Sequence, residues 1–238
     1  MRRIVMMVLR NILFAPYMYL KLCWYAAHTD SIPYDKQWAH IQKLNDMACR
    51  GGNVEVQAYG VENIPKEGGF MFFPNHQGMF DVLAIIKTCP RYFSVVVKRE
   101  LENIFFLNKI FPIMGYYAID RDDVRQSMKV IQNVSKDVAD GKPFLIFAEG
   151  TRSRDGNHIG EFKGGSFKSA QKAKCPIIPV AVIDSYKVMD THSLEKVTVQ
   201  IHYLEPLFYE EYKMMKTPEI AEIVESRIKK TIDIYDVN

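Results

Sequence analysis

Apolar and polar positions alternate along this chain with two different periods. From residue 54 onward, seven short segments are rich in β-branched and aromatic residues, which is typical of strands. The runs at 93–97 and 144–147 are apolar almost throughout, which indicates strands buried on both faces. Val197–Tyr203 alternates more, as an edge or one-sided strand does. The predicted strands are Val54–Tyr59, Phe70–Phe73, Tyr92–Val97, Tyr116–Ile119, Phe144–Phe147, Ile177–Ile183 and Val197–Tyr203.

Helical periodicity fills much of the chain around these strands. Residues 123–139 and 218–231 each place apolar residues on one face, and another helix is predicted over 35–49, ending at Gly51-Gly52. The predicted inward residues are Val124, Met128, Ile131 and Val138 in the first helix and Ile220, Ile223, Val224 and Ile228 in the second. Strands that alternate with helices predict an α/β fold, with a largely parallel central sheet flanked by helices. Ligands of such sheets bind at the carboxyl ends of the strands.

The first 28 residues form a separate apolar pattern. Arg10, Pro16 and Lys21 interrupt it, so it does not supply the roughly 20 apolar residues of a membrane span. No small-residue cleavage site follows, so a signal peptide is not expected. In one helix, Arg3, Arg10 and Lys21 would project within about 20° of one another, although Pro16 would kink it. This basic stripe predicts a helix lying in the membrane interface at the cytoplasmic face, and the alternative is a core helix with a solvated stripe.

Length and charge add little to this picture. The 238 residues are enough for one sizeable core. We divide them into an N-terminal helical membrane-associating segment, 1–52, and an α/β domain, 53–238. The net charge of +3 is too small to indicate nucleic-acid binding, but it suits an anionic surface or a phosphorylated substrate.

Cysteine and histidine spacing predicts neither disulfides nor a metal site. The four cysteines, Cys23, Cys49, Cys89 and Cys175, include no CxxC pair, and the six histidines show no ligand spacing. We therefore expect buried reduced thiols in a cytosolic setting and no metal.

A histidine and an aspartate follow the second predicted strand. That strand breaks at Pro74 and a helical pattern starts near Val82, so His76 lies at a strand-to-helix junction. Within one helix, five residues would turn the side chains of His76 and Asp81 about 140° apart. The two can meet if His76 precedes the helix and Asp81 lies in its first turns. An imidazole oriented by a carboxylate is suited to accept a proton from a hydroxyl, although this spacing also occurs in ordinary surface or core pairs.

A polar loop follows the fifth predicted strand. Gly150, Thr151 and Arg152 bring a glycine turn, a hydroxyl and a guanidinium together, and Lys163 follows. Backbone amides at such a turn, beside a guanidinium fork, form a phosphate cradle. The spacing is not that of a Walker loop, and a solvated basic loop is the alternative. Glu149 only accepts hydrogen bonds when ionised, so we expect it to order these cations and not to touch phosphate.

Two further segments indicate a function less specifically than these motifs do. Gly115–Arg121 is a short apolar strand that ends in Asp120-Arg121, so Arg121 would add a second guanidinium to the same anion site. Ile177–Val180 is an apolar segment with one proline, which would lie in the core or form the wall of an acyl pocket, and we expect the core.

These segments, taken together and in this order, resemble the glycerolipid acyltransferase family, most closely the bacterial 1-acyl-sn-glycerol-3-phosphate acyltransferases. The family's NHxxxxD, glycine-to-Asp-Arg, FPEGTRS and proline-strand blocks are matched by Asn75–Asp81, Gly115–Arg121, Phe147–Ser153 and Ile177–Val180. The resemblance spans residues 54–205. Gly78, Ala118 and Ala148 stand where serine, a bulkier residue and proline are usual in the family.

The resemblance implies an acyl transfer. His76 would deprotonate the sn-2 hydroxyl of lysophosphatidic acid, which would attack the thioester of acyl-CoA or acyl carrier protein and yield phosphatidic acid. Asp81 would orient His76 and balance its charge. No cofactor is required, and the expected partners are the lysophospholipid, the acyl donor and the membrane surface, not nucleic acid.

The resemblance also implies a phosphate site. Arg121 and Arg152 would bind the substrate phosphate, Gly150 and Thr151 would shape the loop, and Lys163 is a further candidate. Glycerol-3-phosphate or another lysolipid is the alternative acceptor. A non-catalytic membrane-surface module and a thioesterase are less favoured, since the first would not need His76 and Asp81 and the second would not need the arginines.

Overall fold

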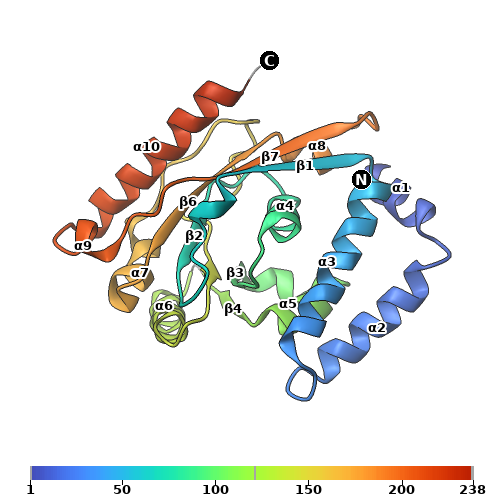
Figure 1. Cartoon of the computed structure of the whole chain (residues 1–238), viewed down its shortest axis with the longest axis horizontal. Helices are drawn as coiled ribbons and strands as arrows, with labels where there is room; N and C mark the ends of the chain where they lie inside the picture. Colours follow the sequence, from blue (N-terminus) through green and yellow to red (C-terminus); the bar gives the residue numbers. More distant parts are fainter. Residues whose placement is uncertain (1, 121, 237–238) are drawn as a thin grey trace.

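A seven-stranded sheet forms the centre of the molecule (Figure 1). The computed structural model describes residues 2–120 and 122–236. Within them the strand order is β1-β7-β6-β2-β5-β3-β4, and every neighbouring pair is parallel except β6 and β7. The strands are β1 (Val54–Tyr59), β2 (Met71–Pro74), β3 (Ser94–Lys98), β4 (Tyr116–Ile119), β5 (Phe144–Leu145), β6 (Ile177–Ile183) and β7 (Val197–Tyr203). The prediction of a largely parallel α/β sheet is confirmed.

The strands themselves lie close to their predicted positions. β1, β4, β6 and β7 have the predicted bounds, while β2 and β3 begin one and two residues later than predicted. β5 is shorter than predicted. Ile146 still donates a backbone hydrogen bond to Phe72, but the chain then leaves the sheet so that Phe147 stacks on His76.

β7 differs from its prediction as an edge strand. It lies between β1 and β6, and its alternation arises because one face is deeply buried while the other is mostly half-buried. Val197, Val199 and Ile201 enter the core from that buried face. The one-sided alternative was therefore right, and the edge alternative was wrong.

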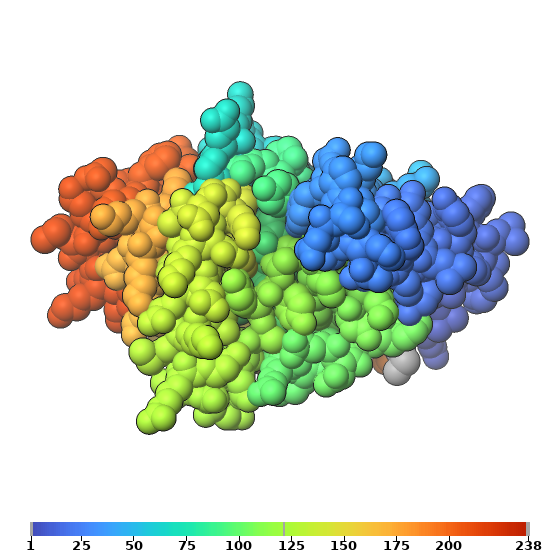
Figure 2. All heavy atoms as spheres, turned by 90° about the horizontal axis from the view of Figure 1, so that it is seen from below, coloured from blue at the N-terminus to red at the C-terminus, as the bar shows by residue number. Residues whose placement is uncertain are grey.

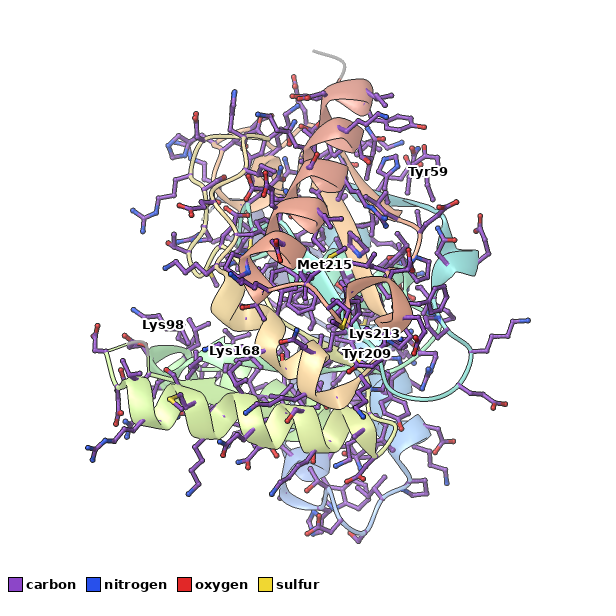
Figure 3. All side chains as sticks on the ribbon, turned by 90° about the vertical axis from the view of Figure 1, so that its left-hand side faces the viewer. Tyr59, Lys98, Lys168, Tyr209, Lys213 and Met215 are labelled. Atoms are coloured by element: carbon purple, nitrogen blue, oxygen red, sulfur yellow. The ribbon has the colours of Figure 1, made fainter. Side chains whose placement is uncertain are left out.

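Helices cover both faces of the sheet. The described helices are α1 (Arg2–Arg10), α2 (Ala15–Ala27), α3 (Tyr34–Gly51), α4 (Asp81–Thr88), α5 (Leu107–Met114), α6 (Val124–Ala139), α7 (Lys168–Ala173), α8 (Tyr186–Met189), α9 (Tyr209–Tyr212) and α10 (Thr217–Tyr235). Side chains of α3, α4 and α5 belong to one core cluster, and those of α6, α7 and α10 to the other. Figure 3 looks onto the second face, with α10, α7 and α6 in view. In Figure 2 the N-terminal helices form one end of the molecule.

Successive residues of a strand pack alternately into these two core clusters. In β2, Phe72 faces the first cluster, whereas Met71 and Phe73 face the second. In β6, Val180 and Ala181 divide in the same way, and the whole strand is buried. Because successive side chains point to opposite faces, an apolar run with no polar alternation is what a strand covered on both sides requires.

The inward face of α6 is only partly as predicted. Val124 and Met128 are 68% and 57% exposed, so their placement on the inward face was wrong. The helix instead buries Val130, Val134 and Val138. In α10, by contrast, the predicted Ile220, Val224 and Ile228 are all buried.

Residues 2–27 form two helices and not one rod. α1 and α2 are bent by 98° relative to each other, and Pro16 lies in the first turn of α2, where its missing N–H is not needed. Arg3 is 1% exposed and donates to the carbonyl oxygens of Gly52 (2.6 Å) and Ser193 (2.8 Å). The predicted basic stripe is therefore wrong. Arg3 fixes α1 to the protein, while Arg10 is exposed.

Two glycines allow α1 to approach the end of α3. A Cβ on Gly51 would lie 2.4 Å from Asn11 Nδ2, and one on Gly52 would lie 2.4 Å from Met7 Cε. α3 in turn contacts α4, α5 and β1. The described part of the segment 1–52 thus packs onto the sheet domain, and the assignment of this segment as a separate unit stays a prediction.

A band of exposed apolar side chains covers α1, α2 and the turn between them. Its most exposed members are Leu13 (87%), Leu20 (68%), Phe14 (64%) and Tyr17 (64%). Phe105 extends this apolar band, since its ring lies 5.2 Å from that of Tyr19. Among the described residues, no single helix has the length and apolarity of a membrane span, although α1 and α2 taken together meet that test.

Candidate active site

The turn between β2 and α4 carries His76. Asn75 ties this turn to β6, because its side chain both donates to the Val182 carbonyl (3.0 Å) and accepts from the Val182 amide (2.7 Å). On the other side, Ser153 N–H donates to the His76 carbonyl at 2.9 Å. The backbone of His76 is thus fixed before α4 begins at Asp81.

His76 and Asp81 meet as the spacing predicted. His76 Nδ1 lies 2.7 Å from Asp81 Oδ2, with His76 in the turn and Asp81 at the start of α4. Asp81 is fully buried and also accepts from the backbone amides of Gln77 (2.7 Å) and Gly78 (3.0 Å). The amino terminus of a helix further favours a carboxylate. With Nδ1 hydrogen-bonded to Asp81, Nε2 is the nitrogen left to exchange a proton with a ligand.

Glu149 braces the same turn from the other side. Its Oε1 accepts from the His76 amide at 2.6 Å, and its Oε2 accepts from the Gly160 amide at 2.9 Å. Burial raises the pKa of Glu149 above the ordinary value of a glutamate, although the two amides oppose that shift. The sequence predicted that Glu149 orders cations, but its hydrogen-bond partners are backbone amides.

Phe147 supports the imidazole ring. The ring centroids of Phe147 and His76 are 3.8 Å apart and their planes are inclined by 20°. The same residue lines the cavity beside the histidine. Phe147 lies two residues after the end of β5, so the loop at 147–153 begins in contact with the turn that carries His76.

An apolar cavity of about 460 Å³ opens beside His76. Its wall combines residues of α4, β3, α5 and α6, among them Leu83, Val97, Ile110 and Ile131. This volume lies within the range that holds small organic ligands. It sits at the carboxyl ends of the parallel strands, as such sheets lead one to expect. Ile177–Val180 is in the core, as predicted, and does not line this cavity.

Gly150 and Lys163 face the cavity together with His76. Gly150 has φ +76°, a left-handed conformation that favours glycine. A Cβ there would lie 3.3 Å from Lys163 Nζ, so the lysine passes close over the glycine turn. A basic group and a glycine turn thus line the same cavity as His76.

The other predicted cationic residues are placed differently. Arg152 Nη1 lies 3.6 Å from Asp190 Oδ1, and Asp190 also approaches the turn at Gly78, where a Cβ would lie 3.0 Å from its Oδ2. Thr151 is exposed. Arg121 lies outside the described residues.

A family model described as Acyltransferase matches residues 55–183, which is more than half of the chain. The chain belongs to the acyltransferase family. The matched region includes the turn at His76 and the loop at Glu149.

Curated acyltransferases from distant organisms align with the chain. It is 32% identical to a 1-acyl-sn-glycerol-3-phosphate acyltransferase of Borreliella burgdorferi over 132 residues, which is 56% of this chain and 52% of that protein. It is 28% identical over 182 residues to a probable enzyme of the same name from Mycoplasma pneumoniae, covering 74% and 67% of the two chains. The chain thus spans about half the length of the first relative.

A solved acyltransferase has the same fold. The crystal structure of the 1-acyl-sn-glycerophosphate acyltransferase PlsC from Thermotoga maritima superposes with a TM-score of 0.74 and covers 98% of this chain and 99% of its own. Its sequence identity is 22%, so this likeness concerns the fold.

Several residues of this site escaped the sequence analysis. Gln77, Asn157 and Ser185 contribute to hydrogen bonds behind the turn, and Asp190 pairs with Arg152. Gln77 lies inside the His76–Asp81 motif, so its position was a usable signal. The others lie in loops whose sequence carries no periodicity.

The cysteines are placed away from this chemistry. Cys49, Cys89 and Cys175 are buried, as predicted, whereas Cys23 is only partly so. Burial raises the pKa of Cys49 to about 11 and that of Cys89 and Cys175 to about 12, so these thiols stay protonated near neutral pH.

Proposed function

We propose that this protein transfers an acyl chain from acyl-CoA or acyl carrier protein to the sn-2 hydroxyl of lysophosphatidic acid, forming phosphatidic acid for phospholipid synthesis. One observation carries this proposal: the bonded pair of His76 and Asp81 opens onto a large apolar cavity. A proton acceptor beside an apolar cavity suits an alcohol acceptor and a fatty acyl chain together. The names of the relatives point to the same acceptor.

The reaction needs one base and one nucleophile. His76 Nε2 takes the proton of the acceptor hydroxyl as its oxygen attacks the thioester carbonyl carbon. The tetrahedral adduct collapses, the carbon–sulfur bond breaks, and the imidazolium returns the proton to the leaving thiolate. Asp81 keeps Nδ1 protonated and stabilises the imidazolium, which is its part in a hydrolase triad without the serine. No cofactor or metal takes part in these steps.

Lys163 and the arginines would bind the acceptor phosphate. Lys163 lines the cavity near His76, and Arg152 lies on the loop that donates to the His76 carbonyl. A guanidinium gives a bidentate match to phosphate, whereas an ammonium acts as a point charge. Arg121 is proposed as the second guanidinium, and Gly150 and Thr151 as the residues that shape the loop.

The exposed apolar band over α1 and α2 would hold the enzyme on a membrane, in a peripheral or monotopic position at the cytoplasmic face. Its leucines and aromatic residues are the side chains that interfacial helices bury. Such a position brings the site close to a lysophospholipid. The alternative acceptors, glycerol-3-phosphate and other lysolipids, would use the same base.

A panel of acceptors and donors tests the function. We expect thiol release from acyl-CoA or acyl carrier protein only when lysophosphatidic acid is present, with phosphatidic acid as product by mass spectrometry. His76→Ala should lose about 10²–10⁴-fold in rate, because a positioned base contributes that much. The control His192→Ala changes an exposed histidine and should keep full activity.

The panel also separates the alternatives. Thiol release that depends on glycerol-3-phosphate alone would reassign the acceptor, and release without any acceptor would indicate a thioesterase. If no acceptor supports release in the wild-type protein, it is not an acyltransferase of this kind.

A further inference from the structure

A buried run of amide side chains leads from the catalytic turn into the protein. Gln77 is 1% exposed and follows His76 directly. Its Nε2 donates to Asn157 Oδ1 at 2.6 Å, and its Oε1 accepts from the Ser185 amide at 2.9 Å. Both ends of the Gln77 amide are therefore held by segments far from it in the sequence.

Asn157 connects this amide to the end of the chain. It is 8% exposed, and its Nδ2 donates to Asp184 Oδ1 (3.0 Å) and to Asp236 Oδ1 (2.8 Å). Its Oδ1 accepts from the Asp184 amide at 2.9 Å as well as from Gln77. In Figure 1 the loop after β5 runs beside the C-terminal end of α10, and Asp236 is the residue that follows this helix.

These contacts reach the reacting histidine through one shared oxygen. Gln77 N–H donates to Asp81 Oδ2, the same atom that binds His76 Nδ1. A shift of Gln77 would therefore change the distance or angle at which Asp81 holds the imidazole. A buried polar network of this kind fixes geometry more than it adds stability, since each hydrogen bond replaces one to water.

We propose that Asn157 and Asp236 are positioning residues for the pair of His76 and Asp81. The C-terminal end of α10 holds Asn157, Asn157 holds the side chain of Gln77, and Gln77 sets the carboxylate that orients the base. The catalytic consequence rests on the proposed function. The link is distinct from the phosphate site and from the apolar cavity, because Gln77, Asn157 and Asp236 do not line that cavity.

Three variants at one helix end test this link. Asp236→Ala removes the acceptor, Asp236→Asn keeps an oxygen at that position, and Asp233→Ala removes an exposed carboxylate one turn earlier on α10. For Asp236→Ala we expect kcat to fall about threefold to tenfold with an unchanged KM for lysophosphatidic acid, as the loss of one hydrogen bond implies. Asp236→Asn and Asp233→Ala should keep the wild-type kcat. Asp236 directly follows the last turn of α10 and is only half-buried, so folding should be retained.

Hydrogen exchange gives a readout that does not need activity. The amides of Gln77 and Gly78, which donate to Asp81, should exchange faster in Asp236→Ala than in the wild type, Asp236→Asn or Asp233→Ala. Unchanged exchange, or faster exchange with unchanged kcat, overturns the proposal. If the wild-type protein acylates no lysophospholipid, the proposed function fails on its own, and exchange alone then decides whether the link exists.

Discussion

At the scale of single residues, the site depends on how many hydrogen bonds one carboxylate accepts. Asp81 accepts hydrogen bonds from the imidazole of His76 and from two backbone amides, and its side chain is fully buried. Glu149 fixes the backbone of the same residue, since its carboxylate accepts a hydrogen bond from the amide of His76. The base is thus oriented through its ring by one acid and through its backbone by another. Preorganisation of this kind is what a positioned general base requires.

Gly150 gives a residue-scale prediction. Its φ of +76° disfavours a side chain, and an added methyl would press on Lys163. Gly150→Ala should therefore lower the free energy of unfolding by about 1–2 kcal/mol in urea denaturation. Gly165→Ala is the matched control, because a Cβ there meets nothing within 4 Å and its φ is not positive. Equal stability of the two variants would contradict the strain argument.

At the scale of elements, α1 and α2 differ from the rest of the fold in what they leave uncovered. Other helices bury their apolar stripes on the sheet, whereas these two expose leucines and aromatic rings while Arg3 and Asn11 fasten α1 to the end of α3. Because of the bend of 98°, the two helices do not form one straight rod. The proposed membrane anchor would rely on apolar burial more than on the basic stripe that the sequence suggested.

That anchor can be tested by removing its apolar side chains. Changing Leu13, Phe14 and Leu20 to serine should weaken binding to vesicles of anionic phospholipid at least about tenfold, because each side chain stabilises the bound state by burial. Cosedimentation measures the bound fraction. Met214→Ser is the control, since Met214 is 89% exposed and lies outside this band. Unchanged sedimentation of the triple variant would show that α1 and α2 do not form the anchor.

At the scale of the whole molecule, the buried side chain of His202 in β7 contacts both β1 and α10. His202 is 4% exposed, its ring stacks on Tyr59 with centroids 4.6 Å apart, and Tyr235 lies 4.4 Å from it. Burial lowers the pKa of His202 to about 4. The unfolded chain, with an ordinary histidine pKa near 6.5, therefore binds more protons between these two values.

The free energy of unfolding should therefore decrease as the pH falls. The contribution of neutral His202 is complete above about pH 6.5 and is lost as the pH falls toward 4, which amounts to about 2 kcal/mol at pH 5. The unfolding free energy of His202→Gln should decline less than that of the wild type between pH 7 and 5. His192→Gln, at an exposed position, should follow the wild type. Parallel curves for His202→Gln and the wild type would contradict the assignment.

The sequence by itself determined the elements and the reactive pair. Strand positions followed from runs of β-branched and aromatic residues, because that pattern reflects the local pleat. The meeting of His76 and Asp81 followed from a spacing of five residues across a strand-to-helix junction. These inferences needed only neighbours along the chain.

Tertiary structure alone decided what distant segments do to one another. It placed β7 inside the sheet, buried Arg3 against Gly52, turned Val124 of α6 to solvent, and bound Asn157 to Asp236. None of these features produces a periodic pattern in the sequence, because each depends on which surfaces meet when separate elements pack. The histidine and its acid could be read from the sequence, while the hydrogen bonds that hold them in place could be found only in the folded molecule.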